Sequence, residues 1–332
     1  MEIFADGNAA TGSLRGNAMS GTETTPVTMS ASNPATTGGV ETELLGPEEF
    51  YTAFTARNRG LISDREQQML RRAVILVAGC GSIGGAVVEP LVRLGAERLV
   101  LAEPDIYELH NLNRQRACMR DIGRNKATVL AGWVAQVNPH AAVRVETAGI
   151  TAGNAARLVS NAALVFDGVD VTAQPALVCK YLLHKEARRA GVPVISGYDI
   201  AGVQLVMVYD YRGGMPVLGG RVAERDMPEM DPLRFLARVV PCTALPLEIF
   251  PELRRRLSGA NTGFPQLVYS AQMFGVLAPR LALDLLSERP VRRRILVDVH
   301  DLPRPRGARW RATAARVAEL TRMLPAVLGH RR

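Results

Sequence analysis

The feature that most constrains the fold is a regular alternation of short apolar runs with longer helical stretches between Ala73 and Ser196. The apolar runs have the length and β-branched content of buried strands, and they are Ala73–Ala78, Arg98–Ala102, Ala142–Glu146, Ala163–Asp167 and Val192–Ser196. The stretches predicted to be helices are Ile83–Leu94, Asn125–Val137, Thr151–Ser160 and Ala173–Ala190. Because strand–helix–strand units cover both faces of a parallel sheet, the sequence predicts an α/β fold with a doubly wound, mostly parallel sheet.

After Gly197 the alternation loosens. Antiparallel strands are expected at Val203–Tyr209 and Arg294–Val299, and a long helix at Pro265–Leu286. Residues 1–46 are rich in Thr, Ala, Gly, Ser and Asn without a hydrophobic period, so a disordered tail is expected there. We expect a helical, arginine-bearing segment at 47–72 and a nucleotide-binding domain at 73–200. The second half of that domain is expected at 201–300, and a C-terminal tail with a helix at 301–332.

The composition narrows the class of protein. Of 332 residues, 47% are hydrophobic and 22% charged, which fits a globular chain and excludes a wholly disordered or fibrous one. No apolar run reaches the roughly 18 residues of a membrane span, so a cytoplasmic protein without membrane contact is expected. The four cysteines form no C-x-x-C pair, so no structural zinc is expected. The net charge of +8 comes from scattered arginines, which does not favour nucleic-acid binding.

A glycine-rich turn follows the first predicted strand. Gly79, Gly81 and Gly84 form a G-x-G-x-x-G pattern that opens a helix, as in Rossmann-like nucleotide-binding folds. Glycines allow the backbone to approach a phosphate, and the helix N-terminus offers free N–H donors. Glu103 ends the second strand, where a carboxylate accepts hydrogen bonds from ribose hydroxyls. Together these residues predict a nucleotide site.

Charged residues follow at the same predicted edge of the sheet. A long polar loop from Asp105 to Gln115 contains Arg114, Lys126 begins the next helix, and Asp170 follows the fourth strand. Arg and Lys neutralise phosphates, and an Asp at a strand end is suited to hold Mg²⁺ against them.

The string Asn111-Leu112-Asn113-Arg114-Gln115, the G-x-x-K ending at Lys126 and the D-x-x-D ending at Asp170 resemble the ThiF/MoeB adenylyltransferases, the superfamily of ubiquitin-activating enzymes. The resemblance covers roughly residues 55–200 well and the chain to about 300 weakly. It implies that the three glycines line ATP and that Glu103 takes the ribose, where the family more often has Asp. Asp105 would support the site, Asn111, Arg114 and Lys126 would hold the triphosphate, and Asp170 would bind Mg²⁺.

Two further residues follow from the same resemblance. Arg59 lies where the family has an arginine that reaches the neighbouring subunit's site, which implies a homodimer with Arg59 acting in trans. Cys242 lies roughly where the family carries a reactive thiol, although a buried, inert cysteine is the more common case.

The function predicted from this resemblance is ATP-dependent adenylation of a carboxylate on a peptide or small carrier protein, giving an acyl-adenylate and pyrophosphate. Two alternatives remain open at this point. An NAD(P)-dependent oxidoreductase would explain the glycine turn and Glu103 but not Arg114, Lys126 and Asp170. A nucleotide-binding subunit without catalysis would explain the fold but not the retention of those charges.

Overall fold

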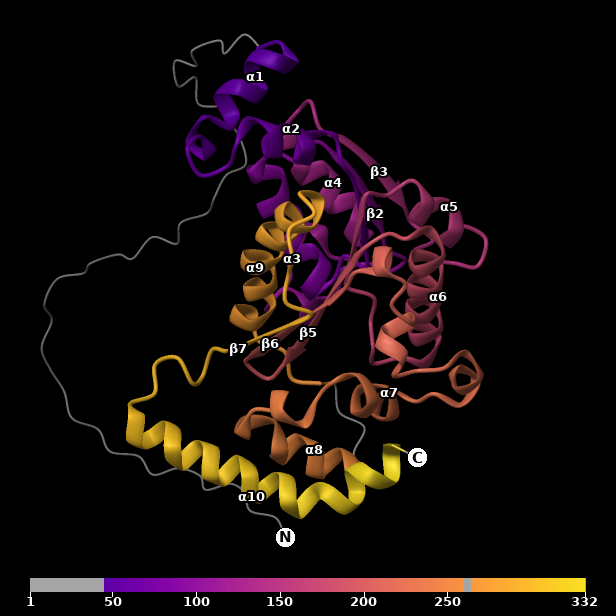
Figure 1. Ribbon diagram of the computed structural model, residues 1–332, viewed down its shortest axis with the longest axis vertical. Helices are drawn as coiled ribbons and strands as arrows, with labels where there is room; N and C mark the ends of the chain where they lie inside the picture. Colours follow the sequence, from indigo (N-terminus) through magenta and orange to yellow (C-terminus); the bar gives the residue numbers. More distant parts are fainter. Residues whose placement is uncertain (1–44, 260–263, 332) are drawn as a thin grey trace, which may run out of the picture. The chain divides into compact units, whose positions relative to one another are not determined.

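The computed structural model describes residues 45–259 and 264–331, and the predicted tail at 1–46 lies outside them except for its last two residues. Within the described chain, seven strands form one sheet in the order β3-β2-β1-β4-β5-β6-β7 (Figure 1). The strands are β1 Val74–Ala78, β2 Arg98–Ala102, β3 Ala142–Glu146, β4 Leu164–Asp167, β5 Val194–Ile200, β6 Val203–Tyr209 and β7 Arg294–Asp298. β1 to β5 pair in parallel, and β6 and β7 add antiparallel strands. The predicted doubly wound fold is confirmed.

The helices on the two faces of the sheet are α3 Ser82–Leu94, α4 Lys126–Val137, α5 Ala155–Ser160, α6 Gln174–Ala190 and α9 Val268–Leu286. Adjacent residues of β1 point to opposite faces, so each face has its own core. Ile75 and Val77 belong to the core with α3, α4 and α9, whereas Leu76 and Ala78 belong to the core with α5 and α6. Figure 1 shows these two helical layers on either side of the sheet.

Three predicted boundaries differ from the structure by three or more residues. β5 extends to Ile200 instead of ending at Ser196, because a two-residue turn at Ala201 and Gly202, both with positive φ, pairs it with β6. α5 begins at Ala155 because Asn154 accepts the N–H of Thr151 and closes a turn before the helix. α9 begins only at Val268, since residues 264–267 are extended or irregular.

The residues before β1 form α1 Pro47–Phe54, a 3₁₀ turn at Ala56–Asn58 and α2 Asp64–Arg72. Ser63 and Glu66 form a reciprocal capping box at the start of α2. From the last turn of α2, Arg71 bridges Glu48 of α1 and Glu97 before β2, each at 2.7 Å. This pairing joins the N-terminal helices to the rim of the sheet.

The remaining described helices are α7 Pro232–Val239, α8 Phe250–Leu257 and α10 Arg306–Arg331, with a 3₁₀ turn at Leu247–Ile249 before α8. Met323 of α10 packs with Ile249 and Phe250 in a third, smaller core, and Figure 1 shows α10 running beside α8. The other 3₁₀ turns are Leu109–Asn111, Met119–Asp121, Tyr211–Gly213, Val217–Gly220, Glu224–Glu229 and Cys242–Ala244. Among the described residues, no helix is long and apolar enough to cross a membrane.

Candidate active site

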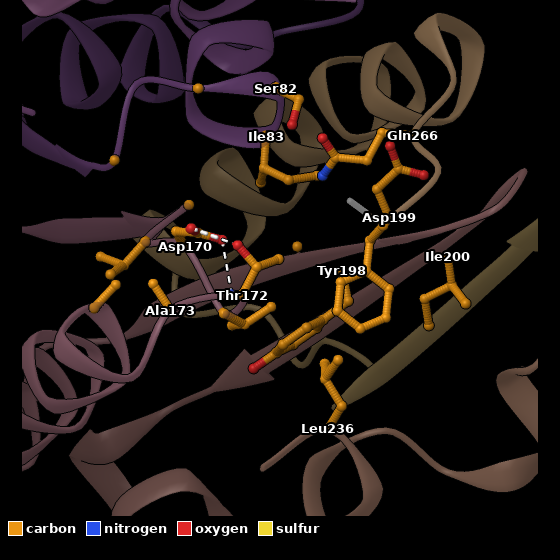
Figure 2. A pocket seen from close by; sticks show the side chains of 18 of the residues that line it. Ser82, Ile83, Asp170, Thr172, Ala173, Tyr198, Asp199, Ile200, Leu236 and Gln266 are labelled. Carbon is orange, nitrogen blue, oxygen red and sulfur yellow. Dashed lines mark hydrogen bonds between the residues drawn. The ribbon is translucent and has the colours of Figure 1, made fainter. Parts of the chain in front are cut away.

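A cavity of about 970 Å³ opens at the carboxyl ends of β1, β2, β4 and β5. Strand order reverses between β1 and β4, and ligands of doubly wound sheets bind at this switch point. Figure 2 shows the cavity with Asp170, Thr172 and Asp199 around its middle. The structure brings most of the predicted residues together in its lining, namely Gly79, Gly81, Glu103, Asp105, Asn111, Arg114, Lys126 and Asp170. Gly84 was also predicted to line the nucleotide, but it does not line the cavity.

Two glycines of the turn, Gly79 and Gly84, have no room for a side chain. Gly79 has a φ of +80°, and a Cβ there would lie 2.4 Å from the carbonyl oxygen of Gly168. A Cβ on Gly84 would lie 1.8 Å from the carbonyl oxygen of Gly79. Only glycine therefore lets β1 turn into α3 this tightly against the end of β4. The turn leaves the first residue of α3, Ser82, and its unpaired helix N–H groups at the cavity.

The side chain of Glu103 holds the same turn in place through hydrogen bonds. It is 4% exposed, and its two carboxylate oxygens accept the backbone N–H groups of Cys80 at 2.6 Å and Asp105 at 3.0 Å. Burial raises the pKa of Glu103, although these hydrogen bonds and the charge of Lys126 oppose the rise. Each oxygen has a second lone pair, so Glu103 can hold the turn and still accept a ribose hydroxyl.

Lys126 is held at the first position of α4. Asn125 caps this helix, and its amide donates to the backbone oxygen of Glu103 at 2.8 Å. Lys126 is 7% exposed, and its Nζ lies 3.2 Å from Asp105 Oδ2, whose side chain is 64% exposed. The ammonium group is thus fixed at the cavity wall, beside the solvated carboxylate of Asp105 and near the buried carboxylate of Glu103.

Arg114 is placed by the predicted polar loop. The side chain of Asn111 accepts the N–H of Glu108 at 3.0 Å and closes the turn that precedes Arg114. The guanidinium donates to the backbone oxygen of His110 at 2.9 Å and to Asn113 at 2.8 Å, while Nε is buried without a partner among the described residues. Burial lowers the pKa of Arg114, and the charges of Asp199 and Asp170 oppose that shift. Asn111 therefore has a structural role in this turn, and its contact with the triphosphate stays a prediction.

Asp170 lies at the exposed end of the loop after β4. Its carboxylate accepts the N–H of Thr172 at 2.9 Å and the hydroxyl of Thr172 at 2.7 Å (Figure 2). These bonds use one lone pair of each oxygen, which leaves the carboxylate able to bind a cation. Among the described residues no group of three His, Cys, Asp or Glu could hold a metal alone. One carboxylate beside a phosphate site fits Mg²⁺, which is bound by one or two carboxylates together with substrate phosphates.

Asp199 is a cavity residue that the sequence reading missed. It lies near the end of β5, beyond the point where that strand was predicted to stop. Its Oδ1 accepts the hydroxyl of Ser270, and its Oδ2 is buried without a partner among the described residues. Burial raises the pKa of Asp199 to about 6, and Ser270 and Arg114 only partly oppose the shift. Its position at the carboxyl edge of the sheet is the signal that could have identified it.

A buried polar network supports the loop that carries Asp170. Asp167 is fully buried, and its Oδ2 contacts Lys180 Nζ at 2.6 Å, His184 Nε2 at 2.9 Å and Ser196 Oγ at 2.6 Å. Burial would raise the pKa of Asp167, but Lys180 and His184 outweigh it and hold that pKa below its usual range. Ionised Asp167 can only accept hydrogen bonds, so Nε2 of His184 carries the proton that faces it. Burial lowers the pKa of His184, which favours a neutral ring whose Nδ1 accepts the hydroxyl of Tyr211 at 2.7 Å.

The last two predicted residues differ in their relation to the cavity. Cys242 lines it, within the 3₁₀ turn after α7. Arg59 is exposed between α1 and α2 and does not line the cavity of its own chain. Its action on the site of a second subunit stays a prediction.

The fold and the cavity define a Rossmann-type α/β protein whose site combines a glycine turn with fixed cations at the switch point. The sequence matches the ThiF family over residues 55–234, and the chain belongs to that family. It is 33% identical over 186 residues to the uncharacterized protein MT1398 of Mycobacterium tuberculosis, covering 55% of this chain and 25% of that protein. It is 29% identical over 147 residues to the SAMP-activating enzyme E1 of Haloferax volcanii, covering 43% of this chain and 53% of that one.

Solved structures share the fold at low sequence identity. The crystal structure of PaaA aligns with a TM-score of 0.55 and 16% identity, covering 78% of this chain and 82% of PaaA. The E. coli tRNA N6-threonylcarbamoyladenosine dehydratase TcdA aligns with a TM-score of 0.51 and 20% identity, covering 72% of this chain and 96% of TcdA. The chain thus spans most of these folds but only a quarter to about half of the curated relatives named above.

Proposed function

We propose that the chain catalyses MgATP-dependent adenylation of a carboxylate on a peptide or small carrier protein. The observation that carries this proposal is that the glycine turn, two fixed cations and one available carboxylate, Asp170, share one cavity at the switch point. An oxidoreductase would leave these cations without a role. The name of the Haloferax volcanii relative, a SAMP-activating enzyme, supports a substrate of this kind.

In the proposed reaction a carboxylate oxygen of the substrate attacks the α-phosphorus of ATP, and the bond to the bridging oxygen breaks, so that pyrophosphate leaves with the electron pair. No general base is needed because the attacking carboxylate is already ionised. The glycine turn and Glu103 would hold the nucleoside, and Lys126 and Arg114 would neutralise the triphosphate in the transition state. Asp170 would hold Mg²⁺, which when bound supplies further neutralisation of the phosphates.

The test is carboxylate-dependent exchange of pyrophosphate into ATP. Lys126→Ala and Arg114→Ala should each lower exchange by about two orders of magnitude or more, because each removes a fixed cation facing developing charge. Lys185→Ala is the matched control, since Lys185 pairs with Glu224 on the exposed surface. Melting temperatures of all three variants should stay close to that of the wild type.

Three results would contradict the assignment. Wild-type exchange rates in the Lys126 or Arg114 variants would remove these residues from the site. Binding of a nicotinamide nucleotide in place of ATP would favour the oxidoreductase. ATP binding without exchange for any carboxylate would indicate a subunit that lacks catalysis.

A further inference from the structure

The cavity has two halves that differ in the charge of the residues lining them. Charged residues line the half that would hold the nucleotide, and uncharged residues line the other half. The charged residues of the lining belong to the loops, the strand ends and the start of α4 within residues 103–199. The lining residues contributed by α7, α8, α10 and the segments between them include none that is charged, and they are Leu233, Leu236, Ala237, Val240, Cys242, Leu245, Ile249, Leu253, Leu257, Phe264, Pro265, Gln266, Leu267 and Met323. We call this set the apolar half.

The apolar residues that line this half recur at the spacing of one helix face in the sequence. In α7 and its C-cap, the residues facing the cavity are Leu233, Leu236, Ala237 and Val240, an i, i+3, i+4, i+7 stripe. In α8, Leu253 and Leu257 face the cavity one turn apart. The three arginines between them do not line it and instead pair with Glu252 and Glu319.

Four leucines of the apolar half are less buried than ordinary core residues. Leu236 and Leu253 are half-buried, and Leu257 and Leu267 are each 37% exposed. The stripe of α7 therefore lines space that a ligand can fill. Filling it with an apolar group removes apolar surface from water, which is the main source of affinity in such pockets.

The two halves meet where the proposed reaction would occur. In Figure 2, Asp170, Thr172 and Asp199 lie between Ser82 and Ile83 on one side and Leu236 on the other. If the nucleotide occupies the charged half, a carboxylate at this junction must extend the rest of its substrate into the apolar half. A charged group placed there would have no charged partner among the described lining residues.

We propose that the substrate carries a bulky apolar group next to its reacting carboxylate, and that this group binds in the apolar half. This inference rests on the proposed function. The same chemistry is offered by a small apolar carboxylic acid and by a peptide that ends in an apolar residue, and the experiment separates these two sources.

Four probes test the proposal in pyrophosphate exchange. The probes form two pairs: N-acetyl-leucyl-leucine against N-acetyl-glycyl-glycine, and octanoate against acetate. In at least one pair, kcat/KM should be about tenfold or more higher for the apolar probe than for its small counterpart. A preference confined to the dipeptide pair identifies a peptide terminus, and one confined to octanoate identifies a small acid. Calorimetric titration of the same probes in the presence of a nonhydrolysable ATP analogue gives a readout that does not depend on turnover.

The matched variants are Leu236→Ser in the apolar half and Leu302→Ser, which is 66% exposed and outside the cavity. Leu236→Ser should weaken binding of the preferred apolar probe by about tenfold, whereas Leu302→Ser should not change it. Leu236→Met, which keeps an apolar side chain, should restore most of the binding and controls for misfolding.

The outcomes distinguish this inference from the proposed function. Equal exchange with the apolar and small probes would overturn the inference and leave adenylation standing. Binding of an apolar probe that depends on Leu236, without exchange, would support the apolar half and contradict adenylation. Absence of both binding and exchange for all apolar probes would overturn the inference.

Discussion

Asp199 is a cavity residue whose buried carboxylate is unfavourable for the stability of the fold. A carboxylate that is largely removed from water, with one oxygen unpaired among the described residues, costs stability when it is ionised. Proteins often retain such costs at functional sites. Its neighbours here are Arg114, Ser270 and Tyr269, of which only Arg114 carries a compensating charge.

The variant Asp199→Asn should be more stable than the wild type at pH 8, by between about 1 and 3 kcal/mol. The folded-state pKa of about 6 lies above the ordinary value of 3.8, so the folded protein holds this proton more tightly than the unfolded chain. Stability from this group is therefore complete below pH 3.8 and is lost as the pH rises through 6. Urea unfolding between pH 4 and pH 8 measures the difference, and an Asn variant that is no more stable at pH 8 would contradict the burial argument.

At the scale of elements, α6 is joined to β4 and β5 by charge as well as by packing. Lys180 and His184 lie one turn apart on α6 and meet Asp167 of β4, to which Ser196 of β5 also donates. Asp167 and Ser196 are partners in the sheet register, so the network crosses both strands. It fixes the strand end from which the loop to Asp170 begins.

Lys180→Met should lower the free energy of unfolding by about 3 kcal/mol or more, because it leaves Asp167 buried without its cation. The double variant Lys180→Met/Asp167→Asn should recover part of the loss, since no charge then remains buried. The pKa of Asp167 is held below its usual range, so its contribution is present above about pH 4 and is lost at lower pH. Lys185→Met, on the exposed face of α6, is the control in the same urea titrations, and equal stability of the two single variants would refute the role of the pair.

At the scale of the whole molecule, we predict a homodimer in which Arg59 serves the partner's cavity. Arg59 is exposed and does not line the cavity of its own chain, which fits a residue that acts across an interface. Mixing inactive Arg59→Ala and Asp170→Ala chains should return about a quarter of wild-type exchange, because about half the dimers are hybrids with one complete site. No recovery from chains that demonstrably exchange, or sedimentation as a monomer, would rule out action in trans.

The second prediction at this scale concerns residues 1–44, whose composition offers no apolar period with which to form a core. Their deletion should change the melting temperature by less than about 2 °C and leave the affinity for MgATP unchanged. Calorimetry and nucleotide titration measure both quantities. A fall of several degrees would mean that this segment packs on the rest of the chain or contributes to a ligand site.

The sequence by itself determined the parallel part of the sheet and the nucleotide half of the cavity. Local patterns carry both. Apolar runs define β1 to β4, and Glu103, Lys126 and Asp170 lie at strand ends or in the loop and helix start that follow them. Because the carboxyl ends of parallel strands share one edge of the sheet, these residues could be grouped without coordinates.

Only the tertiary structure decided the rest, because it depends on contacts between residues distant in the chain. The hairpin at Ala201 and Gly202 extends β5 and so puts Asp199 into the cavity. Burial between β4 and α6 makes Asp167 the centre of an ion-pair network, a role that the D-x-x-D pattern alone does not indicate. The leucine stripe of α7 would read as an ordinary core face, and only the placement of α8 and α10 beside it leaves that stripe lining a cavity.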